Sequence, residues 1–337
     1  SSGVAVFALR RLLAMVPTLV GVTLLTFLFS VAIPGDPARL MVGDHASQET
    51  LERVRKDLGL DQPVMVRYGR FLAGLVRGDL GKSLRTRRPI TAELGERLPA
   101  TLELALAAMA LAIAVGVVLG IVAATRGGLW DTISRVIAVA GISTPVFWWG
   151  LLLILLFYRE LGWLPAQGRF NPFFDPPDTV TGLYLIDGIL RGQWARWWTA
   201  LRHLILPAVT LGYVQLALIA RMTRTSMLEV LKEDYIRTAR SKGLKESRIH
   251  YTHALKSAAA PLVTIVGLTF GELLGGAVIT ETIFGWPGMG KYAVDAILNL
   301  DYSAILGFTL VVGVGFAVVN LVVDLSYAML DPRIRYA

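Results

Sequence analysis

Two glycine-rich segments that run into a lysine have the spacing of a loop that could hold a phosphate group. They are residues 76–83 and 285–292. In a nucleotide-binding P-loop the glycines let backbone amides reach the phosphates, and a serine or threonine after the lysine holds magnesium. Val76 stands where the first segment needs its first glycine, and Tyr292 replaces the serine or threonine of the second. Because each segment lacks a required residue, we expect no nucleotide site and no catalytic residue in this chain.

Few other residues have types and spacing suited to chemistry. His250 and His253 are three apart, but two histidines without a group of carboxylates make a poor metal site, so we expect no metal. No Ser/His/Asp set and no HExxH motif supports an intramembrane enzyme. Glu272 lies within a long apolar stretch, where a carboxylate is a functional candidate by default. It could line a translocation pathway and meet a substrate ammonium, or it could be buried and hydrogen-bonded against a partner.

Residues 234–243 predict a short amphipathic helix with a defined end on each side. Asp234 can cap its N-terminus, and Gly243 stands where a left-handed residue ends a helix. The helix has an apolar stripe and a basic face, formed by Tyr235, Ile236 and Ala239 and by Arg237, Arg240 and Lys242. The stripe could fill a groove on a partner with the arginines at its rim, or the segment could be an ordinary basic loop near lipid headgroups.

The elements that must position these residues are expected to be transmembrane helices. The 337 residues are 54% hydrophobic and only 17% charged, whereas soluble domains carry about 25% charged residues. The sequence therefore predicts an all-α integral membrane protein with six transmembrane helices. The segments that reach the roughly 20 apolar residues needed to span a membrane are 12–33, 104–125, 136–158, 204–220, 258–280 and 303–323.

The net charge of +8 and the lack of cysteine narrow the choice of partners. In so apolar a chain, basic residues indicate loops close to anionic lipid, so membrane lipid is an expected partner. The basic residues are not interleaved with clustered aromatics, so we expect no contact with nucleic acid. Without cysteine the chain has no disulfide and no thiolate metal site.

The distribution of lysine and arginine predicts the topology. With six spans both termini share one side with the loop 221–257, and this side is the denser in basic residues, so we place it in the cytoplasm. The chain then divides into an N-terminal segment with the first helix (1–33), a periplasmic loop domain (34–98) and a permease-like core of five helices (99–337). Within the loop domain we expect helices near 47–59 and 63–75. Glu103, at the outer end of the second span, is expected at the membrane interface.

Residues 281–301 connect the fifth and sixth apolar segments and could form a re-entrant element. They begin with a turn rich in glycine, proline and tryptophan, followed by a short amphipathic helix near 293–300. Irregular backbone is allowed at membrane depth only where protein covers it or where it lines a cavity. A plain external loop is an equal alternative.

The chain resembles a known family along almost its whole length. The stretch 234–244 resembles the cytoplasmic "EAA" loop of binding-protein-dependent ABC importer permeases, in particular of the peptide/nickel branch. The triplet falls on Arg237, Thr238 and Ala239, of which only the alanine is kept, and the family's glycine falls on Gly243. Further stretches that resemble this branch in the same order are 33–37, 78–83, 100–104, 221–224, 280–288 and 320–335. The chain is most similar to the B-type membrane subunits of bacterial dipeptide permeases.

This resemblance implies the transmembrane permease subunit of an ATP-driven importer for di- or oligopeptides. It implies a homologous second permease subunit, two cytoplasmic ATPase subunits that bind ATP and magnesium, and a periplasmic peptide-binding protein. It also implies the bacterial inner membrane, with both termini cytoplasmic. The residues that it assigns to a cytoplasmic coupling helix are Asp234, Tyr235, Ile236, Arg237, Thr238, Ala239, Arg240 and Gly243. The candidate residues of a periplasmic gate are Trp286, Pro287 and Gly288.

Several other functions remain open at the level of sequence. Importers of nickel chelates or haem have permeases of the same kind. A stand-alone secondary transporter would show inverted repeats and a channel a filter sequence, and the sequence has neither visible symmetry nor such a filter.

The topology can be tested with single cysteines, since the chain has none of its own. We predict that an impermeant maleimide labels Ser47→Cys in cells with a permeable outer membrane but leaves Ser247→Cys unlabelled until the inner membrane is broken. Labelling of Ser247→Cys alone would reverse the topology.

Overall fold

The computed structural model describes residues 2–32, 36–43 and 46–330, and these fold almost entirely into helices. In this part of the chain the one pairing of β type is an isolated bridge between Lys82 and Pro89. The helices are α1 (Ser2–Ala32), α2 (Pro37–Val42), α3 (Gln48–Asp57), α4 (Val64–Val76), α5 (Ile90–Arg126), α6 (Gly128–Ser143), α7 (Val146–Leu153), the π-helix η1 (Ile154–Glu160), α8 (Tyr184–Leu190), α9 (Trp194–Val230), α10 (Asp234–Ser241), α11 (Glu246–Arg248), the π-helix η2 (Ile249–Ala254), α12 (Leu255–Gly276), α13 (Val278–Ile283), α14 (Met289–Leu298) and α15 (Tyr302–Leu330).

Membrane-spanning helices form most of the molecule, as predicted. Within the described residues α1, α5, α9 and α15 are long and apolar enough to cross a membrane. Two bent pairs of helices would bring the number of spans to six if each pair counts as one span. The first pair is Gly128–Ser143 with Val146–Glu160, and the second pair is Glu246–Ala259 with Pro261–Leu273. The all-α membrane fold is therefore confirmed, while the count of six spans stays a prediction.

The third predicted span is interrupted, so the prediction of one continuous helix over 136–158 is wrong. The two halves meet at an angle of 109°. Thr144 is extended, with φ −90° and ψ 126°, and Pro145 follows it. A proline disfavours helical backbone at the residue before it, so α6 ends at Ser143 and a new helix starts after Pro145.

The helices of the loop region begin and end close to the predicted residues. Ser47 caps α3, because its hydroxyl accepts a hydrogen bond from the Thr50 amide at 3.2 Å. Gly59 follows that helix with φ +65°. α4 then covers most of the second predicted segment, whereas α5 begins at Ile90 and makes the end of the loop region continuous with the second span.

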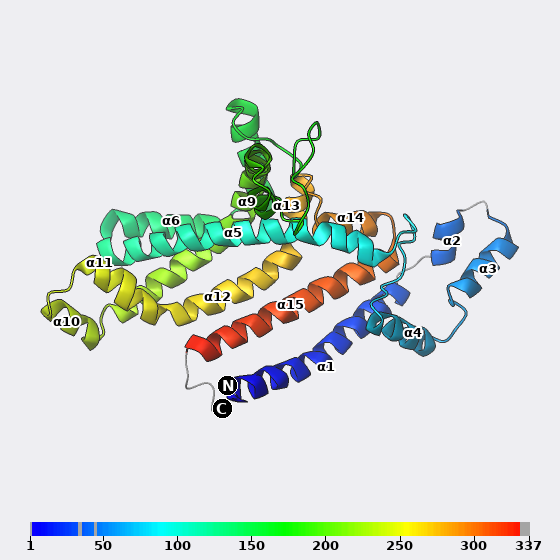
Figure 1. Cartoon of the computed structure of the whole chain (residues 1–337), viewed down its shortest axis with the longest axis horizontal. Coiled ribbons are helices and arrows are strands. Elements are labelled where there is room, and N and C mark those ends of the chain that lie inside the picture. Colours follow the sequence, from blue (N-terminus) through cyan, green and yellow to red (C-terminus); the bar gives the residue numbers. More distant parts are fainter. Residues whose placement is uncertain (1, 33–35, 44–45, 331–337) are drawn as a thin grey trace.

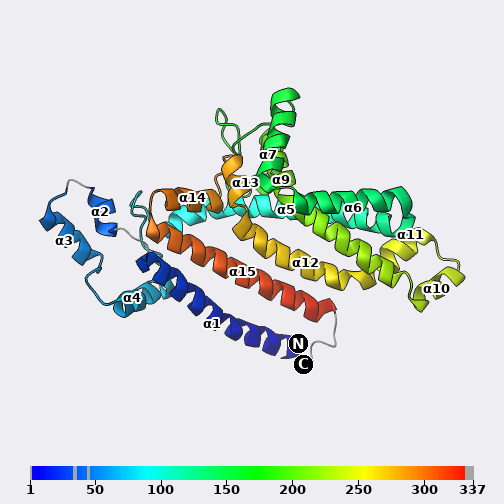
Figure 2. The same cartoon turned by 180° about the vertical axis from the view of Figure 1, so that it is seen from behind.

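The long helices give the molecule two ends. In Figure 1, α1, α5, α12 and α15 run along the long axis, and the view from behind in Figure 2 shows the same arrangement. Both views place α10 and α11 at one end, with the start of α1 and the end of α15 toward the same side. α2–α4 and α14 lie toward the other end, which we call the outer end.

Small residues bring α5 and α9 into backbone contact in the middle of the molecule. Ala108, Ala112, Gly116 and Gly120 are spaced by four and share one face of α5. A Cβ added to Gly120 would lie 2.7 Å from a carbonyl oxygen of α9, and one added to Gly212 would lie 2.6 Å from a carbonyl oxygen of α5. Helices in lipid associate through such close packing, because apolar side chains gain little by leaving lipid.

We predict that Gly120→Val destabilises the chain by about 1–3 kcal/mol, the usual cost of overpacking. Gly95→Val is the matched control, because it makes the same change on the same helix with open space around it. The measurement is the midpoint of thermal unfolding in detergent. Equal midpoints for the two variants would show that the contact between α5 and α9 is looser than described.

Candidate functional site

The predicted coupling helix exists as α10, but Asp234 does not cap it. Glu233 is the N-cap residue and makes no cap hydrogen bond with its side chain, and Asp234 is the first helical residue. The expected cap at Asp234 is therefore wrong by one position. Its carboxylate still lies in the first turn, where the helix dipole favours negative charge, and pairs at 3.3 Å with Arg237 on the exposed surface.

The other end of α10 is the predicted glycine cap. Gly243 has φ +76°, a conformation that costs glycine little. Its amide donates to the Arg240 carbonyl at 2.9 Å, and the Leu244 amide donates to the Ala239 carbonyl at 3.3 Å. These two bonds make a Schellman motif, which ends the helix sharply.

The apolar stripe of α10 packs onto this chain and not outward. Ile236 is fully buried and Ala239 is 9% exposed, in a cluster with Ile121 of α5 and Met227 of α9. The expectation that the stripe fills a groove on a partner is therefore wrong for Ile236 and Ala239, and for Tyr235 it stays a prediction. Tyr235 remains 43% exposed, and its hydroxyl donates to Ser257 of α12 at 2.8 Å.

The face that α10 exposes is polar. It consists of Asp234, Arg237, Thr238 and Ser241, which are spaced to share one side of the helix. Arg240 turns back to the chain instead, with its Nε 2.8 Å from Glu246. The second oxygen of Glu246 lies 3.0 Å from His250 Nε2, so this carboxylate ties α10 to the helix that leads into the membrane.

Glu272 is exposed on α12 and lines an open cavity. The cavity has a volume of about 580 Å³ and lies between α12, α1 and α15. Its walls include Thr18, Phe316 and Asn320 and are mostly apolar. Glu272 is therefore open to a substrate or to a partner, and both its place on a translocation pathway and its burial against a partner stay predictions.

The candidate gate residues form a turn at 284–288, the gate turn, which is sealed against α5. Trp286 is 1% exposed, and its indole Nε1 donates to the Ala100 carbonyl at 2.9 Å. Pro287 is exposed, whereas Gly288 is buried and precedes α14. The segment is thus packed against the protein along most of its length.

The second glycine-rich segment, residues 285–292, surrounds a carboxylate of this chain. Glu281 is fully buried and accepts a hydrogen bond from the Thr101 hydroxyl at 2.6 Å and one from the Lys291 amide at 2.9 Å. A Cβ added to Gly288 would lie 2.2 Å from one of its oxygens. Glu281 belongs to the stretch 280–288 that resembles the family, but no role was predicted for it. Its place just before a glycine-rich turn and a helix start is the signal that could have indicated one.

The first glycine-rich segment, residues 76–83, lies against the buried carboxylate of Asp301. Ser83 donates its hydroxyl to this carboxylate, and the Leu84 amide donates at 3.1 Å. Asp301 also accepts from the Ala304 amide at 3.2 Å in the first turn of α15, as an N-cap residue does. Both glycine-rich segments therefore hold carboxylates of the chain itself.

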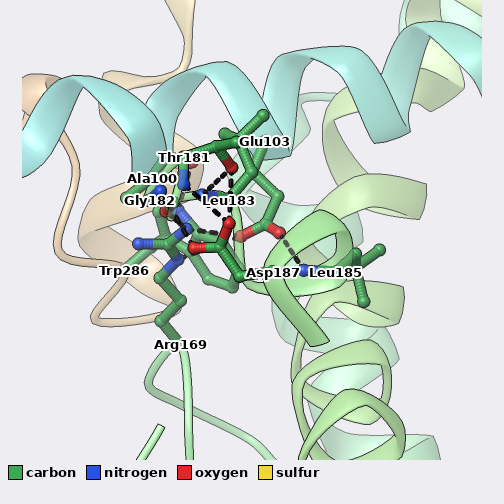
Figure 3. Close-up of polar contacts among 9 residues, drawn as sticks. All are labelled: Ala100, Glu103, Arg169, Thr181, Gly182, Leu183, Leu185, Asp187 and Trp286. Atoms are coloured by element: carbon green, nitrogen blue, oxygen red, sulfur yellow. Dashed lines mark hydrogen bonds and ion pairs between the residues drawn. The ribbon is translucent and has the colours of Figure 1, made fainter. Parts of the chain in front are cut away.

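Glu103 is buried within the protein in an ion pair, while its expected place at the membrane interface stays a prediction. Arg169 donates to Glu103 Oε2 from Nε at 3.0 Å and from Nη2 at 2.6 Å, and the Leu185 amide donates to Oε1 at 2.8 Å. Figure 3 shows these side chains meeting beside Trp286. The Arg169 guanidinium also lies 3.7 Å from the centroid of the Tyr184 ring. The partners are far apart in sequence and the loop has no periodicity, so no pattern indicated this pair.

Asp187 fixes the same loop from within (Figure 3). Its carboxylate accepts from the Thr181 amide and hydroxyl, both at 2.7 Å, and from the Gly182 amide at 2.9 Å. Burial alone would raise the pKa of Asp187, but these hydrogen bonds together outweigh it and hold the pKa below its ordinary value. The Gly168 amide donates to the Phe284 carbonyl at 2.8 Å, which joins the loop to the gate turn.

Comparison with known proteins gives consistent matches. Residues 116–336 match the family described as binding-protein-dependent transport system inner membrane component, and residues 4–105 match the N-terminal family of such membrane components. The chain is 49% identical to the dipeptide transport system permease protein of Alkalihalophilus pseudofirmus, over 98% of this chain and 99% of that protein. It is 50% identical to the probable D,D-dipeptide transport system permease protein of Escherichia coli, over 96% of each.

One solved structure shares the fold. It is the inward-facing MetNI methionine ABC transporter, with a TM-score of 0.50 and 16% sequence identity, and the match covers 72% of this chain and 96% of that chain. At this identity the likeness concerns the fold alone.

We predict that Asp187→Asn loosens the loop by about 1–3 kcal/mol, because its amide group would face a backbone donor and leave it unpaired. The measurement is hydrogen exchange at the Thr181 and Gly182 amides. Asp175→Asn is the control, since Asp175 is exposed.

Because the pKa of Asp187 is depressed, the carboxylate stabilises the loop fully above about pH 4, near the ordinary aspartate pKa, and loses this effect as the pH falls further. Unchanged exchange in Asp187→Asn at pH 7 would contradict this anchoring role.

Proposed function

Since this chain belongs to the family of binding-protein-dependent transport system inner membrane components, we propose that it forms half of a translocation pathway for di- and oligopeptides. As a member of that family it is a membrane-embedded transport subunit and not an enzyme, and the predicted family is confirmed. The proposal of a peptide substrate rests on the near full-length similarity to dipeptide transport permeases.

A homologous second permease subunit completes the pathway in this proposal. The support is that Glu272 lies exposed beside an open cavity on a single chain, and a carboxylate is costly at membrane depth unless it meets water, a partner or a substrate. A peptide-binding protein delivers the substrate to the outer end. Both chain termini and α10 then lie in the cytoplasm of a bacterial cell.

Two ATPase subunits of the complex bind ATP and magnesium, and one of them docks on the polar face of α10. The support is that the two faces of α10 differ. Ile236 and Ala239 are buried against this chain, whereas Arg237 and Thr238 are exposed and free to contact a partner. A charged docking face gives specificity and a fast approach more than it gives affinity.

The packing of α10 suggests how a push from the ATPases reaches the membrane. Ile236 lies in one buried cluster with Ile121 of α5 and Met227 of α9. Displacement of α10 would therefore move the inner ends of both helices. Transport by alternating access further requires two conformations of the complex that differ in affinity for ATP and for the loaded binding protein. Without that difference, ATP hydrolysis would not be coupled to transport.

We predict that the assembled complex accumulates dipeptide in proteoliposomes with ATP, and that Arg237→Glu weakens the retention of the ATPases about tenfold, or roughly 1.4 kcal/mol. The reason is that the substitution reverses a charge on the exposed face of α10. Pull-down of the ATPases and dipeptide uptake are the two measurements.

Lys245→Glu is the matched control, because it makes the same charge change at an exposed position outside α10. If Arg237→Glu keeps its ATPases as Lys245→Glu does, the docking face is elsewhere. If the wild-type complex accumulates a nickel chelate or haem but no dipeptide, the proposed substrate is wrong.

A further inference from the structure

The carboxylate of Glu281 accepts hydrogen bonds at both of its oxygens, while its burial raises its pKa above the ordinary value. Thr101 Oγ1 accepts the Met289 amide at 2.8 Å, so its own proton is directed to Glu281 Oε1 at 2.6 Å. The Lys291 amide donates to Oε2 at 2.9 Å. Both carboxylate oxygens therefore act as acceptors, as they do in the charged form.

The glycines of this segment leave room for that carboxyl group. Added Cβ atoms would lie 2.2 Å from Glu281 Oε1 at Gly288 and 3.0 Å from Oε2 at Gly290. The carboxylate lies at the start of α14, where backbone amides and the helix dipole favour an anion. A loop spaced like a phosphate-binding turn thus holds a carboxyl group of the chain itself.

This carboxylate joins three elements that meet beside the gate turn. Glu281 belongs to α13, Thr101 to α5, and the amides of Met289 and Lys291 to α14. The gate turn lies between α13 and α14, and Trp286 binds α5 separately through Ala100. The turn is therefore attached to α5 on both sides of its glycine-rich centre.

We propose that Glu281 is a positioning residue that clamps the gate turn and α14 to α5, so that the outer gate moves together with α5 and not as a flexible flap. The clamp is a property of this chain alone, while its effect on transport rests on the function proposed above. A glutamine fits the same space but turns one acceptor into a donor, which would face the Thr101 hydroxyl or the Lys291 amide.

The test uses one reporter cysteine in the purified complex. Met289 is 2% exposed, so we expect Met289→Cys to react slowly with a maleimide in an otherwise unchanged chain. Adding Glu281→Gln should raise the labelling rate at least about tenfold, the change that corresponds to roughly 1.4 kcal/mol. Adding Asp295→Asn should leave the rate unchanged, because it makes the same chemical change on the exposed side of α14.

A second pair of variants decides the matter if Glu281→Gln fails to assemble. Thr101→Val removes the hydroxyl and should raise labelling, whereas Thr101→Ser keeps it and should not. Slow labelling in both Glu281→Gln and Thr101→Val, or fast labelling in Thr101→Ser as well as Thr101→Val, would overturn the clamp. Faster labelling with normal peptide uptake would leave the clamp in place and remove its role in gating.

Discussion

Close backbone contact between α5 and α9 is the constraint on which the rest of the structure depends. At Gly116, Gly120 and Gly212 there is no room for a side chain, so the two helices pack backbone against backbone and form one stiff unit. Beyond this seam, the outer half of α5 carries the partners of the gate turn, and its inner end shares the buried cluster of α10. If α10 is the site of ATPase docking, α5 is the element through which its displacement reaches the outer end.

Buried carboxylates that accept several hydrogen bonds connect the segments around the gate turn to one another. Burying a charge is costly unless hydrogen bonds or a partner compensate it. Glu281 and Asp301 are compensated by hydroxyls and by amides at helix starts, and Glu103 by Arg169. Removing one partner of such a buried pair costs about 3–5 kcal/mol. These residues therefore define how the loop after η1, the gate turn and α15 sit against α5, and the open cavity beside Glu272 lies apart from them.

Much of this could be read from the sequence, and the reasons for the failures are physical. Apolar runs predicted the long helices, and Ser47 and Gly243 marked helix ends through local backbone chemistry. The break at Thr144 was also readable, because a proline follows it. Burial of Ile236 and Ala239 was not readable, since an amphipathic pattern gives the apolar face without saying which surface covers it. The Glu103–Arg169 pair and the setting of Glu281 depend on contacts far apart along the chain, which no local spacing reveals.

The central claim is that the outer end of the chain moves as one body with α5. Spin labels at Glu96→Cys on α5 and Ile297→Cys on α14 would measure it directly, because both positions are exposed and the chain has no other cysteine. In the assembled complex the account predicts one narrow distance distribution that is the same without nucleotide and with bound ATP. A second distance, or a shift of the distribution on ATP binding, would show that α14 moves independently of α5 and would contradict the account.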